Sequence, residues 1–278
     1  MKYILVNPLA NNKRGGEALN QVLEIVKEET TVLKITHINL VDFVSKLNEG
    51  DEIIIVGGDG TINNFVNKLN GNIPSNNIYL YPAGTGNDFL KDVNYEGGLF
   101  LMNKYLVNLP KVKVKGKTRY FINGVGFGID GYCCEVGDKL KAESQEKVNY
   151  AGIAVKGLLF NFKKVDAVVE CDGEIYSYKN VWLSPTMHGR YYGGGLMIAP
   201  NQDRLNEEGK VTNVIYTSKS RLSALMSFPS IFKGKHINKK RIVKIKEGKK
   251  IKVTFSRACA LQIDGETIPN VTSYEVEA

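Results

Sequence analysis

The feature that most constrains the fold is a strand, turn and helix in residues 51–69. Four β-branched apolar residues, Ile53 to Val56, form a run typical of a strand that is buried on both faces. Three glycines and one aspartate follow in Gly57–Gly60, and apolar residues then recur at 62, 65, 66 and 69. That spacing places them on one face of a helix. A buried strand that turns directly into a helix predicts an α/β domain with a parallel sheet.

The turn itself is suited to binding an anion. The start of a helix carries unpaired N–H groups and a partial positive charge, and glycine lets the backbone approach a ligand closely because it has no Cβ. Asp59 would repel a bare phosphate, so we expect a metal ion between the two. The alternative is a tight turn that binds nothing, which is common in α/β domains. The turn alone leaves both interpretations open.

Two further loops follow predicted strands of the same region. Residues 7–16 follow a strand at 2–6, and residues 82–88 follow a strand at 78–81. Helical spacing between the strands completes a β-α repeat, which predicts an open parallel sheet. The loops after parallel strands lie at one edge of the sheet, where ligands bind in this architecture. Three loops rich in glycine or asparagine at one edge therefore predict a composite phosphate or nucleotide site.

The pattern changes near residue 110. Short alternating runs follow, and Asp172-Gly173 is a strong hairpin turn signal. We expect mostly antiparallel strands, interrupted by a helix at 143–160 and another that begins near Ser220. Gly124, Gly126 and Gly128 have the wrong spacing for a dinucleotide motif and no clear helix after them, so they indicate close backbone packing.

Composition excludes several classes of protein. No apolar run approaches the ~20 residues that span a membrane, and the first strand is too short for a secretion signal, so we expect a cytoplasmic protein. Four cysteines without C-x-x-C spacing indicate reduced thiols rather than zinc ligands. The formal charge of +8, from 37 Lys and Arg against 29 Asp and Glu, suits an anionic membrane surface or phosphorylated substrates. The basic patches lack the interleaved aromatics of a single-strand binder, and we expect no nucleic acid.

Three stretches of the second part each allow two interpretations. Asp264-Gly265-Glu266 is either an ordinary hairpin turn or the site of a general base, because phosphoryl transfer to an alcohol needs a carboxylate near the hydroxyl. The carboxylates in 203–208 either hold a hard cation or are solvated. The apolar segment 222–232, with lysines after it, is either a core helix, which we favour, or a helix on a membrane surface.

Three motifs in order resemble the diacylglycerol kinase catalytic-domain family of bacterial lipid kinases. They are Gly57-Gly58-Asp59-Gly60-Thr61 with Asn63-Asn64, Pro82-Ala83-Gly84-Thr85-Gly86-Asn87-Asp88-Phe89, and Asp264-Gly265-Glu266. The wider superfamily includes sphingosine kinases, and NAD kinases share the Gly-Gly-Asp-Gly motif. The second motif points to lipid kinases rather than NAD kinases.

The resemblance implies a Rossmann-like, NAD kinase-like open parallel sheet in residues 1–109 and an antiparallel β-sandwich domain in 110–270. It further implies that a C-terminal strand, 271–278, returns toward the first domain, and that the active site lies in the cleft between the domains. ATP is the implied cosubstrate and Mg²⁺ the implied cofactor. The nucleotide-binding residues that it implies are Asn7, Pro8, Leu9, Ala10, Asn11, Gly57, Gly58, Asp59, Gly60, Thr61, Ile62, Asn63, Asn64, Thr85, Gly86, Asn87 and Asp88.

Metal and catalytic roles follow from the same resemblance. Asp59 and Asp88 would organise Mg²⁺, and Glu266 would be the general base with Asp264 as its near neighbour. The family's structural metal site would fall at Leu205 and Glu208, where glutamates stand in place of aspartates. The region around Val112 lacks a carboxylate that many relatives carry.

The function implied is an ATP-dependent lipid kinase acting on diacylglycerol at a membrane surface, with peripheral membrane association. The sequence leaves a homodimer open. Three alternatives also stay open: a kinase of another lipid, a kinase of a soluble substrate such as NAD, and a nucleotide-binding sensor without turnover, which the missing carboxylate near Val112 favours.

Overall fold

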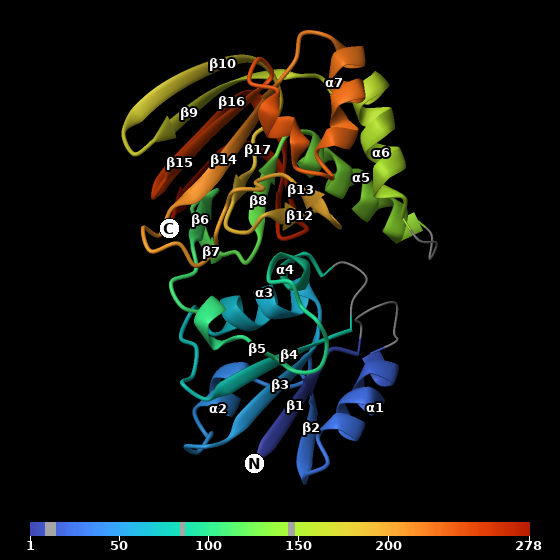
Figure 1. Cartoon of the computed structure of the whole chain (residues 1–278), viewed down its shortest axis with the longest axis vertical. Coiled ribbons are helices and arrows are strands. Elements are labelled where there is room, and N and C mark those ends of the chain that lie inside the picture. Colours follow the sequence, from blue (N-terminus) through green and yellow to red (C-terminus); the bar gives the residue numbers. More distant parts are fainter. Residues whose placement is uncertain (9–14, 84–86, 144–147) are drawn as a thin grey trace. The chain divides into compact units, whose positions relative to one another are not determined.

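The computed structural model describes residues 1–8, 15–83, 87–143 and 148–278. The chain divides into two compact units, Met1–Leu109 and Pro110–Ala278 (Figure 1). Each unit has a β-sheet and a hydrophobic core of its own. The units therefore provide two separate frameworks on which site residues are placed.

The first unit is built on a five-stranded sheet with strand order β2-β1-β3-β4-β5. Neighbouring strands among the first four pair in parallel, and β5 is antiparallel to β4. The predicted open parallel sheet is confirmed. The strands are β1 (Lys2–Val6), β2 (Thr30–Lys34), β3 (Glu52–Gly57), β4 (Asn77–Pro82) and β5 (Phe100–Leu101).

Helices cover both faces of this sheet (Figure 1). Ile54 and Val56 of β3 pack with Val22 of α1 (Gly15–Ile25), and the intervening Ile53 and Ile55 point to the opposite face because strand side chains alternate. All four residues are buried, which explains the continuous apolar run in the sequence. The remaining helical segments are α2 (Leu40–Val44), α3 (Asp59–Lys68), α4 (Asp88–Asp92) and the 3₁₀ turn η2 (Asn103–Tyr105).

The second unit is built on a larger antiparallel sheet. Its order is β7-β6-β17-β16-β8-β11-β14-β10-β9, β15 pairs with β14, and β9 pairs again with β16, so the sheet curls back on itself. This confirms the predicted β-rich, sandwich-like second half. The strands are β6 (Lys111–Val114), β7 (Lys117–Tyr120), β8 (Gly124–Phe127), β9 (Val165–Cys171), β10 (Glu174–Leu183), β11 (Thr186–Met187), β14 (Val211–Thr217), β15 (Val243–Gly248), β16 (Lys250–Ile263) and β17 (Glu266–Glu277), with β12 (Tyr191–Tyr192) and β13 (Leu196–Met197) as a separate pair.

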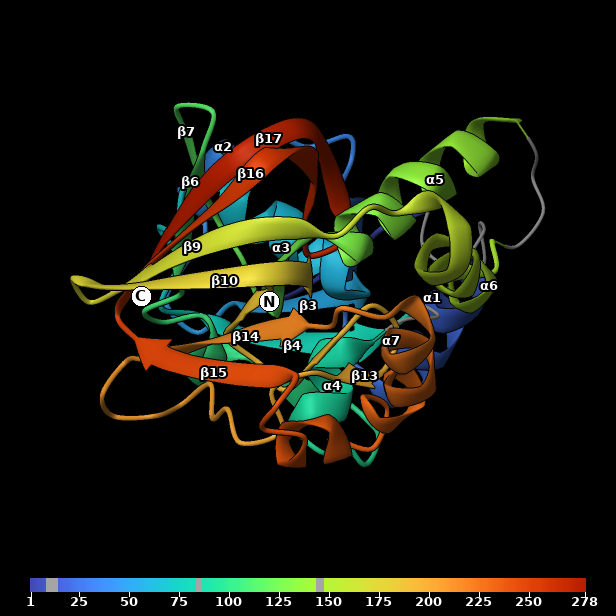
Figure 2. The same cartoon turned by 90° about the horizontal axis from the view of Figure 1, so that it is seen from above.

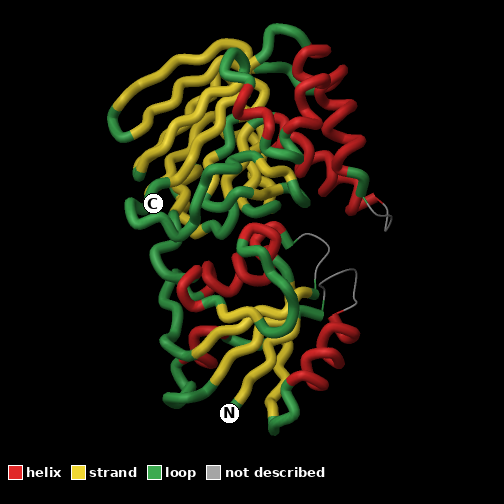
Figure 3. Tube along the Cα trace, in the orientation of Figure 1, coloured by secondary structure: helices red, strands yellow, loops and turns green. Residues whose placement is uncertain are grey.

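Helices gather at one side of these strands (Figure 3). They are α5 (Ile129–Glu143), α6 (Tyr150–Lys156), the π-helix η3 (Gly157–Asn161), α7 (Arg221–Ser227) and the 3₁₀ turns η4 (Phe228–Ser230) and η5 (Lys235–Asn238). The core beneath them includes Trp182 and the stacked rings of Phe127 and Phe255, whose centroids are 3.8 Å apart.

Three details of the second unit differ from the expectation. Residues 271–277 are the second half of β17 and pair with β16 and β6, so they belong to the second unit. A helix does follow the glycines of β8, since α5 begins at Ile129. The expected helix at 143–160 is instead the end of α5, then α6 and η3, with residues 144–147 outside the described chain.

No helix in the described ranges is long and apolar enough to cross a membrane. The four cysteines are free thiols, three of them buried.

Candidate active site

The turn between β3 and α3 has the geometry expected of an anion site. Gly58 caps α3 in an extended conformation, and its carbonyl accepts the N–H groups of Thr61 and Ile62. A Cβ on Gly57 would lie 2.4 Å from Thr61 Oγ1, so only glycine fits there. A Cβ on Gly60 would meet nothing within 4 Å. The protein therefore needs Gly57 for its own packing, whereas the space beside Gly60 is open to a ligand.

Hydrogen bonds tie this turn to the loops on both sides. Asn7, at the end of β1, donates from Nδ2 to Thr61 Oγ1 at 3.0 Å. The carboxylate of Asp59 accepts the backbone N–H of Asp88 at 2.8 Å and that of Phe89 at 3.3 Å, at the start of α4. The residues after β1, β3 and β4 thus meet at one edge of the sheet, as the β-α repeat predicts.

The other predicted nucleotide-binding residues differ in exposure and in hydrogen-bond partners. Ile62 and Asn63 are buried, and both acceptor oxygens of Asn63 bind the side chain of Asn67. Asn64 is exposed on α3, and Asn87 caps α4. Pro8 is the second residue after β1. Leu9, Ala10, Asn11, Thr85 and Gly86 lie outside the described residues.

Asp59 and Asp88 are the carboxylates of this edge. Among the described residues, no cluster of three or more His, Cys, Asp or Glu side chains could hold a metal ion. Mg²⁺ in nucleotide sites takes only one or two carboxylates and completes its shell with water and phosphate oxygens. The pair therefore fits a nucleotide-bound Mg²⁺ but not a metal site made by the protein alone.

In the second unit, Glu266 is the first residue of β17. Its carboxylate forms an ion pair with the guanidinium of Arg119 on β7, and its side chain remains 53% exposed. Strand β7 is the partner of β6, which itself pairs with β17. The sheet therefore places a cation beside the predicted base, a contact that no motif in the sequence indicated.

Asp264 anchors the turn that carries Glu266. Its carboxylate accepts three backbone N–H groups, from Ile122 at 2.6 Å, Asn123 at 2.8 Å and Gly124 at 3.0 Å. The residue has a left-handed φ of 46°, and its own N–H binds the Gly124 carbonyl. With three donors on it, this carboxylate positions the turn; a direct role in catalysis stays a prediction.

The segment around Leu205 and Glu208 is held by local hydrogen bonds and one ion pair. Glu208 forms an ion pair with Lys210, which lowers the pKa of its carboxyl. Asn206 accepts the N–H of Lys210 and donates to the carbonyls of Asp203 and Lys210, and Leu205 donates its N–H to Asp203. Glu208 thus has a lysine as its partner in this structure, and the metal site at Leu205 and Glu208 stays a prediction.

The glycines of β8 serve close packing, as predicted. A Cβ on Gly124 would lie 2.5 Å from the sulfur of Met187, and one on Gly126 would lie 2.2 Å from Asp130 Oδ2. Asp130 itself is a buried carboxyl that the sequence analysis did not single out. Burial raises its pKa to about 6, and Gly131 N–H, at 3.0 Å, partly opposes this rise.

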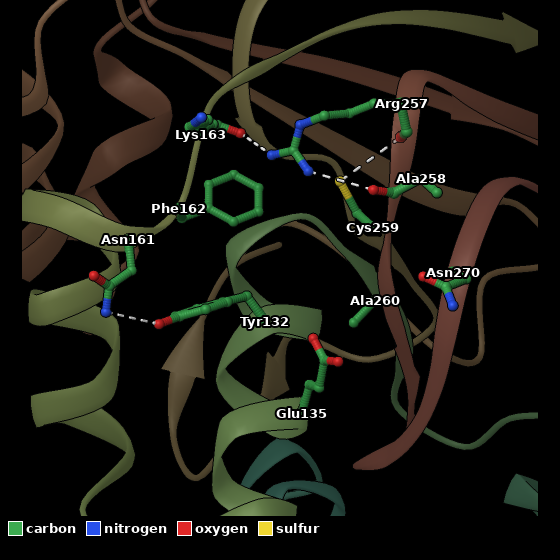
Figure 4. A pocket seen from close by; sticks show the side chains of 10 residues that line it. All are labelled: Tyr132, Glu135, Asn161, Phe162, Lys163, Arg257, Ala258, Cys259, Ala260 and Asn270. Atoms are coloured by element: carbon green, nitrogen blue, oxygen red, sulfur yellow. Dashed lines mark hydrogen bonds between the residues drawn. The ribbon is translucent and has the colours of Figure 1, made fainter.

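A cavity of about 290 Å³ lies along β16 and β17 next to α5 and η3 (Figure 4). Arg257 crosses it, donating to the carbonyl of Lys163 and facing the ring of Phe162 at 5.3 Å. Asn161 donates to the hydroxyl of Tyr132 at 3.1 Å. The lining residues are Tyr132, Glu135, Asn161, Phe162, Lys163, Arg257, Ala258, Cys259, Ala260 and Asn270, and none of them was a predicted site residue.

Comparison with known proteins covers both units. A family model described as the diacylglycerol kinase catalytic domain matches residues 2–108. A second, described as the YegS C-terminal NAD kinase beta sandwich-like domain, matches residues 123–276.

Individual relatives are distant. The Staphylococcus aureus protein named "Putative lipid kinase SAS0691" is 26% identical over 272 residues, which cover 93% of this chain and 87% of that protein. A diacylglycerol kinase of Mycobacterium tuberculosis is 27% identical over 201 residues, covering 67% and 62%. A solved structure described as a diacylglycerol kinase from Bacillus anthracis has a TM-score of 0.68 at 19% identity, covers 99% of this chain and 93% of its own, and shows that the fold is shared. From the two family matches and the loops that meet at one sheet edge, the chain belongs to the diacylglycerol kinase catalytic-domain family of lipid kinases.

Proposed function

We propose that this protein transfers the γ-phosphate of ATP to the hydroxyl of a membrane lipid, with diacylglycerol as the acceptor. The observation that carries the proposal is that hydrogen bonds connect the three loops after β1, β3 and β4. Asn7 donates to Thr61, and Asp59 accepts the backbone N–H of Asp88 at the start of α4. This arrangement supports the proposal because it brings the loops of the family's nucleotide motifs to one edge of the sheet, where an anion would bind. Membership of a lipid-kinase family supports the type of reaction.

On the nucleotide side, the start of α3 offers backbone N–H groups to phosphate oxygens, and Gly60 leaves room for them. Asp59 and Asp88 would bind Mg²⁺ together with the phosphate oxygens of ATP. The ion would neutralise negative charge on the phosphates. Asp59 also fixes the start of α4, so its substitution would disturb two of the three loops.

On the acceptor side, Glu266 would accept the hydroxyl proton. The lipid oxygen forms a bond to the γ-phosphorus, the bond from that phosphorus to the bridging oxygen of ADP breaks, and the proton moves to the carboxylate. Arg119 would orient the carboxylate, and the exposed fraction of Glu266 leaves it accessible to a substrate. Asp264 would hold the turn in register.

The test is incubation with γ-labelled ATP and a panel of diacylglycerol, sphingosine, other lipid alcohols and NAD, with product identification. The proposal predicts label in phosphatidic acid. Label on NAD alone would show a soluble-substrate kinase, and tight ATP binding without transfer to any acceptor would show a sensor; both results contradict the proposal.

A further inference from the structure

Four large apolar side chains are exposed on neighbouring helical segments of the second unit. Phe160 of η3 is 73% exposed, Leu222 and Met226 of α7 are 60% and 69% exposed, and Phe232, just after η4, is 45% exposed. We call these four residues the apolar patch. Single exposed apolar residues are common, but a group of this size indicates an interaction surface.

The four residues share one region because of how α7 packs. Leu222 and Met226 are four residues apart and lie on one face of the helix, whereas Ala224 and Ser227 are buried. Arg221 donates to the carbonyl of Leu158 at 2.8 Å, which joins α7 to η3 two residues before Phe160. The rings of Phe228 and Phe232 meet edge to face at 6.0 Å. Both views show α7 beside α6 at one end of the unit (Figures 1 and 2).

The segments that carry the patch are strongly basic. Residues 219–241 contain seven Lys and Arg and no Asp or Glu, and residues 148–165 contain three Lys and no Asp or Glu. The net charge of the whole chain is only +8, so this region holds a disproportionate share of the positive charge. Exposed members include Lys156, Lys163, Lys219, Lys233, Lys235 and Lys239.

We propose that the apolar patch and its lysines form the surface by which the protein docks on an anionic lipid bilayer. Apolar side chains on a short amphipathic helix enter the boundary between headgroups and acyl chains, while lysines nearby remain with the anionic headgroups. An acidic protein would satisfy the charges, but it would not require four exposed apolar side chains among the lysines. This inference rests on the proposed function, because a lipid kinase must reach its acceptor in a membrane.

The test is sedimentation of the full chain with vesicles of phosphatidylcholine alone or with phosphatidylglycerol, without diacylglycerol or ATP. We expect binding only to the anionic vesicles, and weaker binding as salt rises. The double variant Leu222→Ser/Met226→Ser should bind about tenfold more weakly, because it loses the inserted area. Lys233→Ser/Lys235→Ser should also weaken binding and reduce its salt dependence.

Ile175→Ser is the matched control. Ile175 is 69% exposed, as Met226 is, but lies in the β9–β10 hairpin. It should bind vesicles as the wild type does. Equal vesicle binding by the wild type and the Leu222/Met226 variant, with thermal unfolding showing both folded, would overturn the proposal. So would binding that depends on an added acidic protein rather than on lipid.

Failure of this proposal is distinguishable from failure of the proposed function. Vesicle binding needs no turnover, so the wild type can dock without phosphorylating any lipid. Conversely, the Leu222/Met226 variant should phosphorylate a short-chain, water-dispersed diacylglycerol at the wild-type rate. Loss of that activity in a folded variant would place the patch in the substrate site and contradict a docking role.

Discussion

Two Asp-Gly-Glu turns in the second unit share a backbone but have different surroundings. Asp172 and Asp264 have φ values of 49° and 46°, and the glycines that follow have 90° and 92°. Asp172 accepts N–H groups of Lys249 and Lys250, whereas Asp264 accepts three from residues 122–124. Among the described residues, Glu266 forms an ion pair with Arg119, whereas Glu174 accepts the hydroxyl of Tyr176. The tripeptide is therefore a turn motif, and the role of Glu266 as the base stays a prediction.

The buried carboxyl of Asp130 should make stability depend on pH. Its pKa is about 6 in the folded protein and 3.8 without burial, so the folded state favours the protonated form. The free energy of unfolding that this carboxyl contributes is therefore fully present below about pH 4, where it is protonated in both states. That contribution is lost as pH rises toward 6, because the unfolded chain then ionises more readily than the folded protein. Asp130→Asn should therefore raise the free energy of unfolding at pH 7, by at most about 3 kcal/mol for roughly two pKa units.

Denaturant unfolding of both proteins at pH 4 and pH 7 measures this. The two should be nearly equal at pH 4 and differ at pH 7. A variant less stable than the wild type at pH 7 would show that the carboxylate is stabilised by a partner.

At the scale of elements, the β3–α3 turn contains two glycines with different roles. Gly57 is needed for packing, and Gly60 faces open space. Gly57→Ala should lower the free energy of unfolding by about 1–3 kcal/mol, because its methyl would collide with Thr61. Gly60→Ala adds a methyl into open space within a helix and should leave stability equal or up to about 1 kcal/mol higher. Its ATP affinity should nevertheless fall, since the methyl occupies the space left for the phosphates.

Denaturant unfolding and ATP titration together check both variants. Unchanged ATP affinity in Gly60→Ala would show that the phosphates of ATP do not bind at this turn.

Elements defined by local pattern were predicted from the sequence, and those defined by distant packing were not. Strand β3 is a buried run, β1 is buried over its last three residues, and β4 buries alternate residues. Glycine or asparagine follows each of them, so their order and loops could be predicted. Helix α5 was missed because it contains Gly131 and Gly137, poor helix formers that the fold requires. A Cβ on Gly131 would lie 2.0 Å from the Ala260 carbonyl, a contact across almost 130 residues.

At the scale of the whole molecule, the sequence motifs fall on both units. The nucleotide motifs occupy one edge of the first sheet, and the predicted base lies on a hairpin of the second. The ion pair of Arg119 with Glu266 joins residues 147 positions apart, so no local pattern could reveal it. Glu208, in the predicted metal site, forms an ion pair with Lys210 that the motif does not indicate.

The central claim is that Glu266 accepts the proton in phosphoryl transfer to a lipid, and one comparison tests it most directly. Glu266→Gln and its matched control Glu174→Gln, from the equivalent turn, are assayed with γ-labelled ATP and diacylglycerol in vesicles. Glu266→Gln should lose about 10²-fold or more in turnover while ATP affinity is kept, because the amide cannot accept the proton. Glu174→Gln should match the wild type. Near-normal turnover in Glu266→Gln, or equal losses in both variants, would contradict the account.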